Sequence, residues 1–423
     1  MATTIPANDG VRNPSRYRWV ICGLLFVATA INYIDRQMIG LLKPTLADEF
    51  GWTDQDYAGI IFWFQAAYTV GYLVFGRLVD RIGAKLGYAA AFTIWTVAHI
   101  LHGAAATVAG FSAARMLLGV GESGNFPAGL RAIADWFPAR ERALATGIFN
   151  AGANVGAIVT PFLVPILVLA YGWRATFVIT GVISLVWLVA WYVCYRSPAG
   201  SAKREAEDAA DGAPPPRYLA LLAQRETWAY AIAKLLTDPI WWLFLFWLPD
   251  FLSRRHGLDL LSFGPPLLVI YLMSDLGSVA GGWLSSTLMR RGASANRARK
   301  SAMLICALSV TPIFFAQHVD SLWVAVLLIS LAAAGHQAWS ANLFTLPSDM
   351  FPRRAIGSVI GIGGAAGGVG GMLIATYTGF VLTTFGNYGP IFFVAGSVYL
   401  VALGIIHLLV PNLGDRLAQG HTQ

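Results

Sequence analysis

Charged residues are scarce in this chain. Only 12% of its 423 residues are Asp, Glu, Lys or Arg, whereas a soluble domain carries about a quarter. So few charges cannot coat the two or three soluble domains that the length alone would suggest. Hydrophobic residues make up 57% of the chain and the mean hydropathy is +0.60, which also excludes a disordered chain. The sequence therefore predicts a polytopic membrane protein.

Cysteine and the common cofactor motifs are equally sparse. The three cysteines, Cys22, Cys194 and Cys306, lie in apolar runs, which excludes a secreted disulfide scaffold. No Cys/His set has metal-ligand spacing, and no G-x-x-x-x-G-K-[ST] motif supports ATP-driven pumping. Residues 119–124 match G-x-G-x-x-G, but inside an apolar run such glycines favour close helix contact over nucleotide binding. No cofactor or metal is expected.

Twelve apolar segments are long enough to cross a bilayer, which takes about 20 residues in a helix. They are 18–42, 56–78, 86–107, 109–134, 143–170, 173–195, 227–251, 262–287, 300–317, 320–346, 355–384 and 389–411. The first run is too long for a cleavable signal peptide and lacks a small-residue cleavage site. The fold predicted is an all-α membrane protein.

Basic residues set the orientation. The net charge is +7, yet the chain has no lysine-rich tail that would indicate a nucleic-acid partner. Most of the 29 lysines and arginines fall in alternate connections between the segments, whereas the opposite connections keep only Lys43, Arg174, Arg254 and Arg255. By the positive-inside rule, both termini are predicted to be cytoplasmic.

The chain is predicted to contain two six-helix bundles. A polar, Ala/Pro-rich stretch at 196–226 indicates a cytoplasmic linker between bundles at 18–195 and 227–411, with cytoplasmic termini at 1–17 and 412–423. The halves echo each other at GRLVD (76–80) and GWLSS (282–286), and at FPAR (137–140) and FPRR (351–354). Two halves around a central cavity are typical of secondary transporters.

Two motifs resemble those of the major facilitator superfamily. Residues 76–85, GRLVDRIGAK, resemble its signature loop G-x-L-x-D-R-x-G-[RK]-[RK], from which Ala84 departs. Residues 115–122, RMLLGVGE, resemble its fourth-span motif R-x-x-x-G-x-G. The resemblance implies a gating role for Gly76, Asp80, Arg81 and Gly83. In that role, the Asp80 carboxylate would lie at a neighbouring helix N-terminus and hold the cytoplasmic side closed.

Further segments resemble the anion:cation symporters within that superfamily. They are NYIDR (32–36), ESGNFP (122–127), WFPARER (136–142), HQAWSAN (336–342) and FPRR (351–354), and the last two are most similar to the bacterial hexuronate branch. The resemblance implies a monomer in a bacterial inner membrane that imports a sugar acid with protons.

Four charged residues within the spans are the candidate site. A charge at a helix centre costs at least about 2.5–3.5 kcal/mol, so each needs a partner or a function. Asp35 and Arg36 lie in the first span and Arg115 at a similar depth in the fourth, with Glu122 seven residues deeper on the same face. Arginine suits a substrate carboxylate because it donates two parallel hydrogen bonds. The alternative is a set of ion pairs that only fixes helix packing.

Proton coupling is assigned to the two carboxylates. Glu122 is predicted to lie farther from the arginines and to be the cycling proton acceptor, whereas Asp35 is the second candidate or restrains an arginine. In the second half, Lys234 and Asp238 are spaced to pair along one helix face, and Asp275 has no obvious partner.

A polyhydroxylated substrate requires amides, hydroxyls and flat aromatic faces. The candidates, each of which has ordinary packing as its alternative, are Tyr33, Tyr68, Tyr72, Asn150, Asn154, Trp241, Trp242, His336, Gln337, Trp339, Ser340 and Asn342. The run from His336 to Asn342 is expected to face the cavity because it carries five polar or amphipathic side chains.

The sequence thus predicts a proton-coupled importer of an organic anion, with a hexuronate as the first substrate. Two alternatives stay open. One is the same mechanism with an aldonate such as galactonate, or with an aromatic acid. The other is a membrane sensor that binds a sugar acid without transporting it, against which the absence of an appended signalling domain argues.

Overall fold

Apolar runs form long helices throughout the described chain. The computed structural model describes residues 14–137, 139–196, 218–351 and 353–413. In order, its elements are α1 (Pro14–Phe50), α2 (Asp54–His102), α3 (Val108–Glu122), α4 (Asn125–Trp136), α5 (Ala139–Cys194), α7 (Tyr218–Leu222), α8 (Arg225–His256), α9 (Gly264–Arg290), α10 (Ala295–Val310), the 3₁₀ helix η1 (Thr311–Phe315), α11 (Leu322–Leu343), α12 (Leu346–Met350), α13 (Arg353–Phe385) and α14 (Gly389–Leu409).

Two of these helices each contain two of the predicted segments. Within α2 the backbone turns at Gly83, and within α5 it turns at Gly172, where φ is 78° in both cases. Residues with a Cβ rarely adopt a positive φ, so glycine allows a reversal without a longer loop. The second and third segments therefore lie in α2, and the fifth and sixth lie in α5.

The fourth and tenth segments are each divided into two helices. The fourth continues from α3 to α4 and the tenth from α11 to α12, and each second helix has a proline in its first turn, Pro127 and Pro347. Proline lacks the N–H that would continue the preceding helix. Phe137 and Phe351 then end the second helices in the same extended conformation. Phe137 and Phe351 thus occupy matching places in the fourth and tenth segments.

Nine helices of the described chain are long and apolar enough to cross a membrane. One of them, Ala145–Cys194, reverses at Gly172 and therefore accounts for two predicted segments. The fourth segment is divided between α3 and α4, of 15 and 12 residues, and neither is long enough alone. The third segment is the second arm of α2, which ends at His102.

The first helix is longer than predicted. It continues to Phe50 instead of ending near residue 42, and it takes Lys43 into the interior, where its side chain is 2% exposed. The prediction that Lys43 lies in an external connection is therefore wrong. Its burial is possible because two carboxylates contact its ammonium group.

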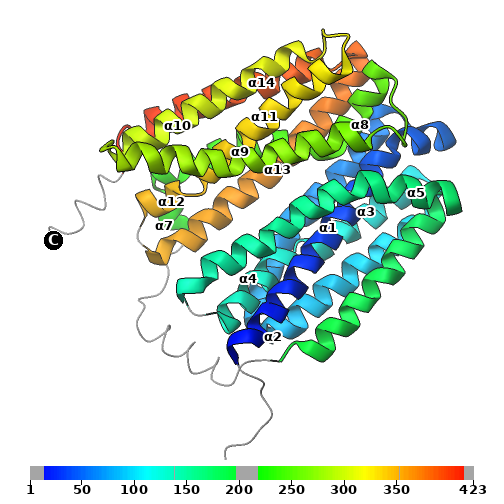
Figure 1. The fold of residues 1–423 in the computed structure, drawn as a ribbon, viewed down its shortest axis with the longest axis horizontal. Helices are drawn as coiled ribbons and strands as arrows, with labels where there is room; N and C mark the ends of the chain where they lie inside the picture. The colour runs from blue at the N-terminus through cyan, green and yellow to red at the C-terminus, as the bar shows by residue number, and fades with distance from the viewer. Residues whose placement is uncertain (1–13, 138, 197–217, 352, 414–423) are drawn as a thin grey trace, which may run out of the picture.

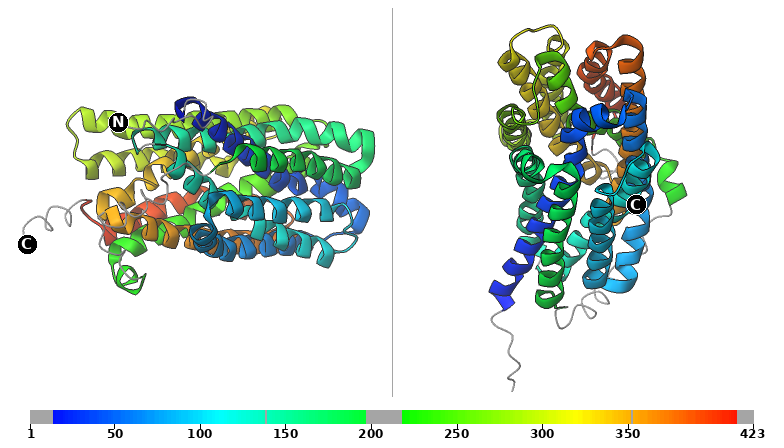
Figure 2. Two further views of the ribbon diagram at one scale, coloured as in Figure 1. Left: turned by 90° about the horizontal axis from the view of Figure 1, so that it is seen from below. Right: turned by 90° about the vertical axis from the view of Figure 1, so that its right-hand side faces the viewer.

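The helices form two groups that lie side by side, α1–α5 and α8–α14 (Figure 1). We call these groups the N-terminal and C-terminal halves. Two further views show most helices running along one common direction (Figure 2). One end of the molecule, where α1 ends, α2 begins and α8 ends, is called the Lys43 end. The opposite end, where α5 ends and α7 begins, is called the linker end.

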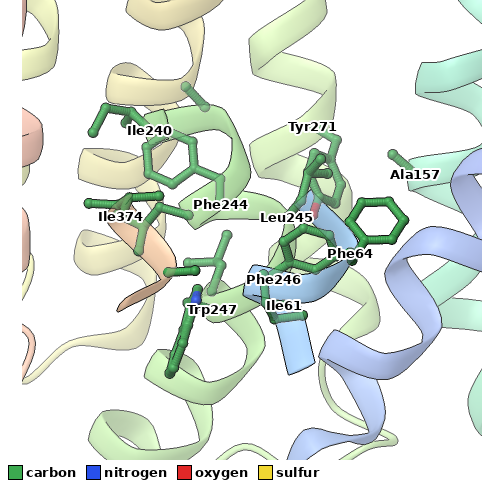
Figure 3. Packing of buried hydrophobic residues seen from close by; sticks show 14 of the residues in the cluster. Ile61, Phe64, Ala157, Ile240, Phe244, Leu245, Phe246, Trp247, Tyr271 and Ile374 are labelled. Atoms are coloured by element: carbon green, nitrogen blue, oxygen red, sulfur yellow. The ribbon is translucent and has the colours of Figure 1, made fainter. Parts of the chain in front are cut away.

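Contacts between the halves extend from the middle of the molecule to the Lys43 end. Phe64 of α2 packs edge-on against Phe246 of α8 at 5.8 Å, and Tyr57 packs likewise against Trp247 at 4.9 Å. Figure 3 shows Phe64 beside Phe246 in this packing. The Tyr57 hydroxyl also donates to the carbonyl of Phe246 at 2.8 Å. Apolar packing therefore closes the Lys43 end.

Candidate functional site

Arg36 lies between the two halves, halfway along α1. Its side chain is 2% exposed, and its guanidinium carbon is within 4.8–5.7 Å of the ring centres of Tyr33, Phe64, Tyr68 and Trp242. Three of these rings come from the N-terminal half, whereas Trp242 comes from α8. Aromatic faces attract a cation and leave its N–H groups to other partners. Arg36 is thus a buried cation at the interface of the halves.

Glu122 is the ionic partner of Arg36. Its Oε2 accepts a hydrogen bond from Arg36 Nε at 2.7 Å, and Arg36 Nη2 donates to Asn32 Oδ1 at 2.9 Å. Both charged side chains are almost completely buried. The prediction that Glu122 lies farther from the arginines is therefore wrong. Glu122 lies seven residues beyond Arg115 in α3 and contacts Arg36 of α1. The spacing of residues along one helix cannot predict a contact with another helix. We call the side chains of Asn32, Tyr33, Arg36, Phe64, Tyr68, Glu122 and Trp242 the Arg36 cluster.

Glycines bring α3 into close contact with α2 beside the Arg36 cluster. A Cβ on Gly119 would lie 2.4 Å from the Phe64 carbonyl oxygen, and one on Gly121 would lie 2.4 Å from the backbone nitrogen of Trp95. Only a residue without a side chain fits such approaches. These two glycines belong to the G-x-G-x-x-G stretch, which confirms close helix contact there.

Arg115 contacts the backbone behind Arg36. Its Nη1 donates to the Arg36 carbonyl oxygen at 3.1 Å, and its guanidinium carbon lies 5.6 Å from the Phe64 ring centre. Within the described residues, its Nε and Nη2 have no hydrogen-bond partner. Arg115 therefore holds α1 and α3 together and adds positive charge beside the Arg36 cluster.

Asp35 points away from this cluster. Consecutive helix residues are separated by about 100° around the axis, so Asp35 and Arg36 face different neighbours. Asp35 Oδ1 lies 3.3 Å from His99 Nε2 of α2, and neither carboxylate oxygen forms a hydrogen bond within the described residues. The prediction paired Asp35 with an arginine and did not consider His99. Two histidines three residues apart in an apolar span, His99 and His102, were the signal that could have found it.

A second aromatic group lies within the C-terminal half. Trp241 stacks on His336 with ring centres 5.5 Å apart and an interplanar angle of 6°, and His336 Nδ1 lies 2.6 Å from the Tyr399 hydroxyl. Tyr271 of α9 packs edge-on against Trp241 at 6.3 Å. Adjacent tryptophans thus serve different groups, because Trp242 belongs to the Arg36 cluster and Trp241 does not. Tyr271 was missed because a lone tyrosine in an apolar span has no distinguishing pattern.

The predicted polar face of α11 is largely buried. Trp339 is fully buried and donates to Thr237 Oγ1 at 3.2 Å, while Asn342 donates to the carbonyl oxygens of Gly281 and Ala338. These contacts hold α11 against α8 and α9. Trp339 and Asn342 therefore pack between helices and, contrary to the prediction, do not face a cavity. Gln337 and Ser340 are half-buried.

The remaining predicted substrate contacts are Tyr72, Asn150 and Asn154. Tyr72 packs against Tyr68 at 6.2 Å and so extends the Arg36 cluster along α2. On α5, Asn154 is half-buried and Asn150 is exposed.

The charges of the second half also have defined surroundings. Lys234 Nζ lies 2.6 Å from Asp238 Oδ2 along α8, as the spacing predicted. Asp275 is half-buried on α9. Lys234, Asp238 and Asp275 are not part of the Arg36 cluster.

The signature loop forms the turn in α2. Gly83 supplies the positive φ of that turn, Arg81 is exposed beside it, and Gly76 has open space around its Cα. The side chain of Asp80, which was predicted to contact a neighbouring helix, lies outside the described residues.

An ion-pair group joins the halves at the Lys43 end. Lys43 Nζ lies 2.9 Å from Asp54 Oδ1 and 2.6 Å from Asp250 Oδ1. Arg254 Nε donates to Asp250 Oδ2 at 2.8 Å, and its Nη2 contacts Asp54. The Tyr388 hydroxyl donates to Asp250 as well. We call these five side chains the Lys43 network; Lys43 and Asp54 come from the N-terminal half, and the others from the C-terminal half.

The sequence profile of the Major Facilitator Superfamily matches residues 25–375. The chain belongs to this superfamily. It is a multi-pass membrane transporter, not an enzyme, and its two groups of helices are the two bundles of that fold.

Several transporters of this superfamily are similar to the chain over most of its length. The hexuronate transporter of Escherichia coli is 30% identical over 93% of this chain and 94% of its own. The galacturonate transporter of Dickeya chrysanthemi is 32% identical over 63% of this chain and 81% of its own. The D-galactonate transporter of Escherichia coli is 28% identical over 96% of both chains.

A solved structure shares the fold. The chain superimposes with a TM-score of 0.74 on a bacterial homologue of the human lysosomal transporter Spinster, in its inward-facing and occupied conformation. The two are 19% identical, and the match covers 95% of this chain and 98% of the other. At that identity the likeness concerns the fold alone.

Proposed function

We propose that this transporter is a symporter that imports a hexuronate, such as glucuronate or galacturonate, together with protons across a bacterial inner membrane. The observation that carries the proposal is the Arg36 cluster, a buried guanidinium between the halves with aromatic faces around it. The similarity to transporters named for hexuronate and galacturonate supports the substrate class.

Substrate binding is proposed to use the N–H groups of Arg36. Arginine can hold a carboxylate through two parallel hydrogen bonds, and the rings around it offer flat faces for a sugar. Glu122 and Asn32 already use two of its nitrogen atoms. The carboxylate of a substrate therefore competes with Glu122 for Arg36.

Proton coupling follows from this competition. A proton on Glu122 removes the charge that binds Arg36 and frees the guanidinium for the substrate. Before binding, the charges of Arg36 and Glu122 cancel; afterwards the charges of Arg36 and the substrate cancel. The site thus stays neutral when a proton and an anion enter together, and it avoids the cost of an unpaired buried charge.

The Lys43 network is proposed to be the outer gate of an alternating-access cycle. If the basic connections lie in the cytoplasm, the Lys43 end faces outside. The network and the apolar contacts then close the outer side, and the conformation described is the one closed to the outside. Both termini and the linker would be cytoplasmic, and a monomer suffices because both halves are in one chain.

An aldonate is the second candidate substrate. The similarity to a D-galactonate transporter over 96% of both chains favours it, since an aldonate carries the same carboxylate on an open chain. The two substrates differ in whether a ring is available to stack on Tyr33, Tyr68 and Trp242.

The test is uptake of labelled glucuronate into proteoliposomes with an inward proton gradient, competed by galacturonate, galactonate and benzoate. We expect accumulation that a protonophore abolishes and that galacturonate inhibits most strongly. Stronger inhibition by galactonate would assign the aldonate. Binding of glucuronate without any accumulation would contradict its proton-driven import.

A further inference from the structure

Asp35 is enclosed on the side of α1 that faces away from the Arg36 cluster. Its side chain is 1% exposed, and His99 of α2 lies within ion-pair distance of it. The Thr180 hydroxyl of α5 lies 2.8 Å from the same His99 nitrogen. The surroundings of Asp35 therefore come from the interior of the N-terminal half and not from the interface between the halves.

The hydrogen bonds define the tautomer of His99. The Thr180 hydroxyl donates to the Thr176 carbonyl oxygen at 2.8 Å, so toward His99 it serves as an acceptor. With that arrangement His99 Nε2 carries the proton, and it lies 2.8 Å from the Thr180 hydroxyl and 3.3 Å from Asp35 Oδ1. The opposite ring nitrogen, Nδ1, is buried without a hydrogen-bond partner in the described residues. His99 thus has one donor near Asp35 and one free acceptor on its far side.

His102 continues this line toward the Lys43 end. Its Nδ1 lies 2.8 Å from the Ala98 carbonyl oxygen and must donate to it, which leaves Nε2 as an acceptor. That Nε2 is likewise buried without a partner among the described residues. The rings of His99 and His102 are 6.3 Å apart, and both pack against Phe177 at 5.1 Å. His102 is the last residue of α2, and Ala104, two residues on, is exposed.

We propose that His99 and His102 carry protons between the Lys43 end and Asp35, by a route within the N-terminal half that is separate from the substrate site. This inference rests on the proposed function, in which protons drive transport. An imidazole that accepts a proton on its free nitrogen can release one from the opposite nitrogen. In His99 the proton taken up at Nδ1 is balanced by release from Nε2 to the Asp35 carboxylate. In His102 the releasing nitrogen, Nδ1, faces the Ala98 carbonyl oxygen, so the His102 ring must turn before it passes a proton to His99. The two free nitrogens are the positions at which such a relay would take up a proton.

The charges around the route balance when both histidines are neutral. Arg36 and Arg115 contribute two positive charges, and Asp35 and Glu122 contribute two negative ones, all within electrostatic reach of each other. The His99 and His102 rings therefore rest neutral and only carry the proton, whereas Asp35 loses its negative charge when the proton reaches it. Asp35 and Glu122 would then titrate on opposite sides of α1.

The test compares His99→Gln and His102→Gln with His318→Gln in proteoliposomes. His318 is exposed in the C-terminal half and serves as the matched control. During exchange of labelled for unlabelled glucuronate, the substrate-loaded transporter alternates between its outward- and inward-open states without net proton release. Accumulation additionally requires the transporter to bind protons on one side of the membrane and release them on the other. We expect about tenfold slower gradient-driven uptake in His99→Gln, with exchange at the wild-type rate, because a proton relay contributes at least that much. His102→Gln should slow uptake less.

Accumulation by His99→Gln at the wild-type rate would overturn the proposal. If His99→Gln also loses exchange, its fold has changed, and the proposal is then tested by the accumulation and exchange of His102→Gln. Slowed accumulation with retained exchange then supports the route, and unchanged accumulation contradicts it.

A second measurement separates this inference from the symport proposal. Infrared spectroscopy after a pH jump follows the band of the protonated Asp35 carboxyl group, which is assigned by its absence in Asp35→Asn. This measurement requires no glucuronate. We expect His99→Gln to shift this band and delay its appearance, whereas His318→Gln leaves both unchanged. A band with unaltered position and rate in His99→Gln would overturn the route. Failure of the wild-type protein to accumulate glucuronate would instead overturn only the proposed function.

Discussion

Nζ of Lys43 lies 2.6 Å from Oδ1 of Asp250, and this pair joins the two halves of the transporter at one end. Lys43 also contacts Asp54, and Asp250 also accepts from Arg254 and Tyr388, so the two residues share their partners. Both side chains are at least nine-tenths buried, which strengthens the attraction and makes a missing partner costly. The pair therefore favours the conformation in which the Lys43 end is closed.

Replacing Lys43 should open that end. Lys43→Met removes two charge-assisted hydrogen bonds, each contributing roughly 1.5–3 kcal/mol, so the closed conformation should lose more than about tenfold in population. Spin labels at positions 104 and 262, in opposite halves, should then report longer distances. Arg290→Met at the linker end, where Arg290 is exposed, should leave the distances unchanged. Equal distances in Lys43→Met and the wild type would show that the network does not hold this end closed.

Substitution of Arg36 by lysine should weaken substrate binding while the charge is kept. An ammonium group cannot donate two parallel hydrogen bonds, and it cannot contact Glu122 and Asn32 with the same geometry. We expect the Kd for glucuronate, measured by calorimetry, to rise by about tenfold to a hundredfold. An unchanged Kd would place the substrate carboxylate elsewhere.

Gly119 should not tolerate a methyl group. A Cβ there would lie 2.4 Å from the Phe64 carbonyl oxygen, so Gly119→Ala must push α3 away from α2. Overpacking of this kind costs about 1–3 kcal/mol, which should lower the Tm in detergent. Gly364→Ala is the matched control, because a Cβ at Gly364 meets no atom within 4 Å. Equal melting temperatures for the two variants would contradict the packing argument.

Trp241 should contribute to affinity but not to coupling. It belongs to the His336 group in the C-terminal half, apart from the charges of the Arg36 cluster. Trp241→Leu should raise the KM for glucuronate severalfold, with protons still driving accumulation. Trp323→Leu should leave both properties unaltered, because Trp323 is exposed on α11. A loss of proton dependence in Trp241→Leu would mean that the two halves share the coupling site.

The sequence predicted the fold well because each span is defined by its own composition. Apolar length is a local signal, and it located most of the helices to within a few residues. The errors came where helix ends depend on distant partners. Lys43 was placed outside because a lysine ends an apolar run, yet Asp54, at the start of the next helix, and Asp250, in the other half, allow α1 to continue past it.

The sequence predicted which charged residues form the candidate site, but it did not predict which of them form pairs. Asp35, Arg36, Arg115 and Glu122 are conspicuous because charges are rare in spans. Which carboxylate meets which guanidinium depends on how the helices of the N-terminal half pack. Gly119 and Gly121 bring α3 against α2, but the sequence does not show which residues they bring together. Glu122 therefore proved to be the partner of Arg36, and Asp35 the partner of His99.

The central claim is that a proton on Glu122 frees Arg36 for the substrate. It is tested most directly by glucuronate uptake into proteoliposomes with an inward proton gradient, comparing the wild type with Glu122→Gln. The account predicts that the wild type accumulates glucuronate until a protonophore is added, whereas Glu122→Gln exchanges glucuronate but no longer accumulates it. Accumulation by Glu122→Gln equal to that of the wild type would contradict the account and remove the coupling proton from Glu122.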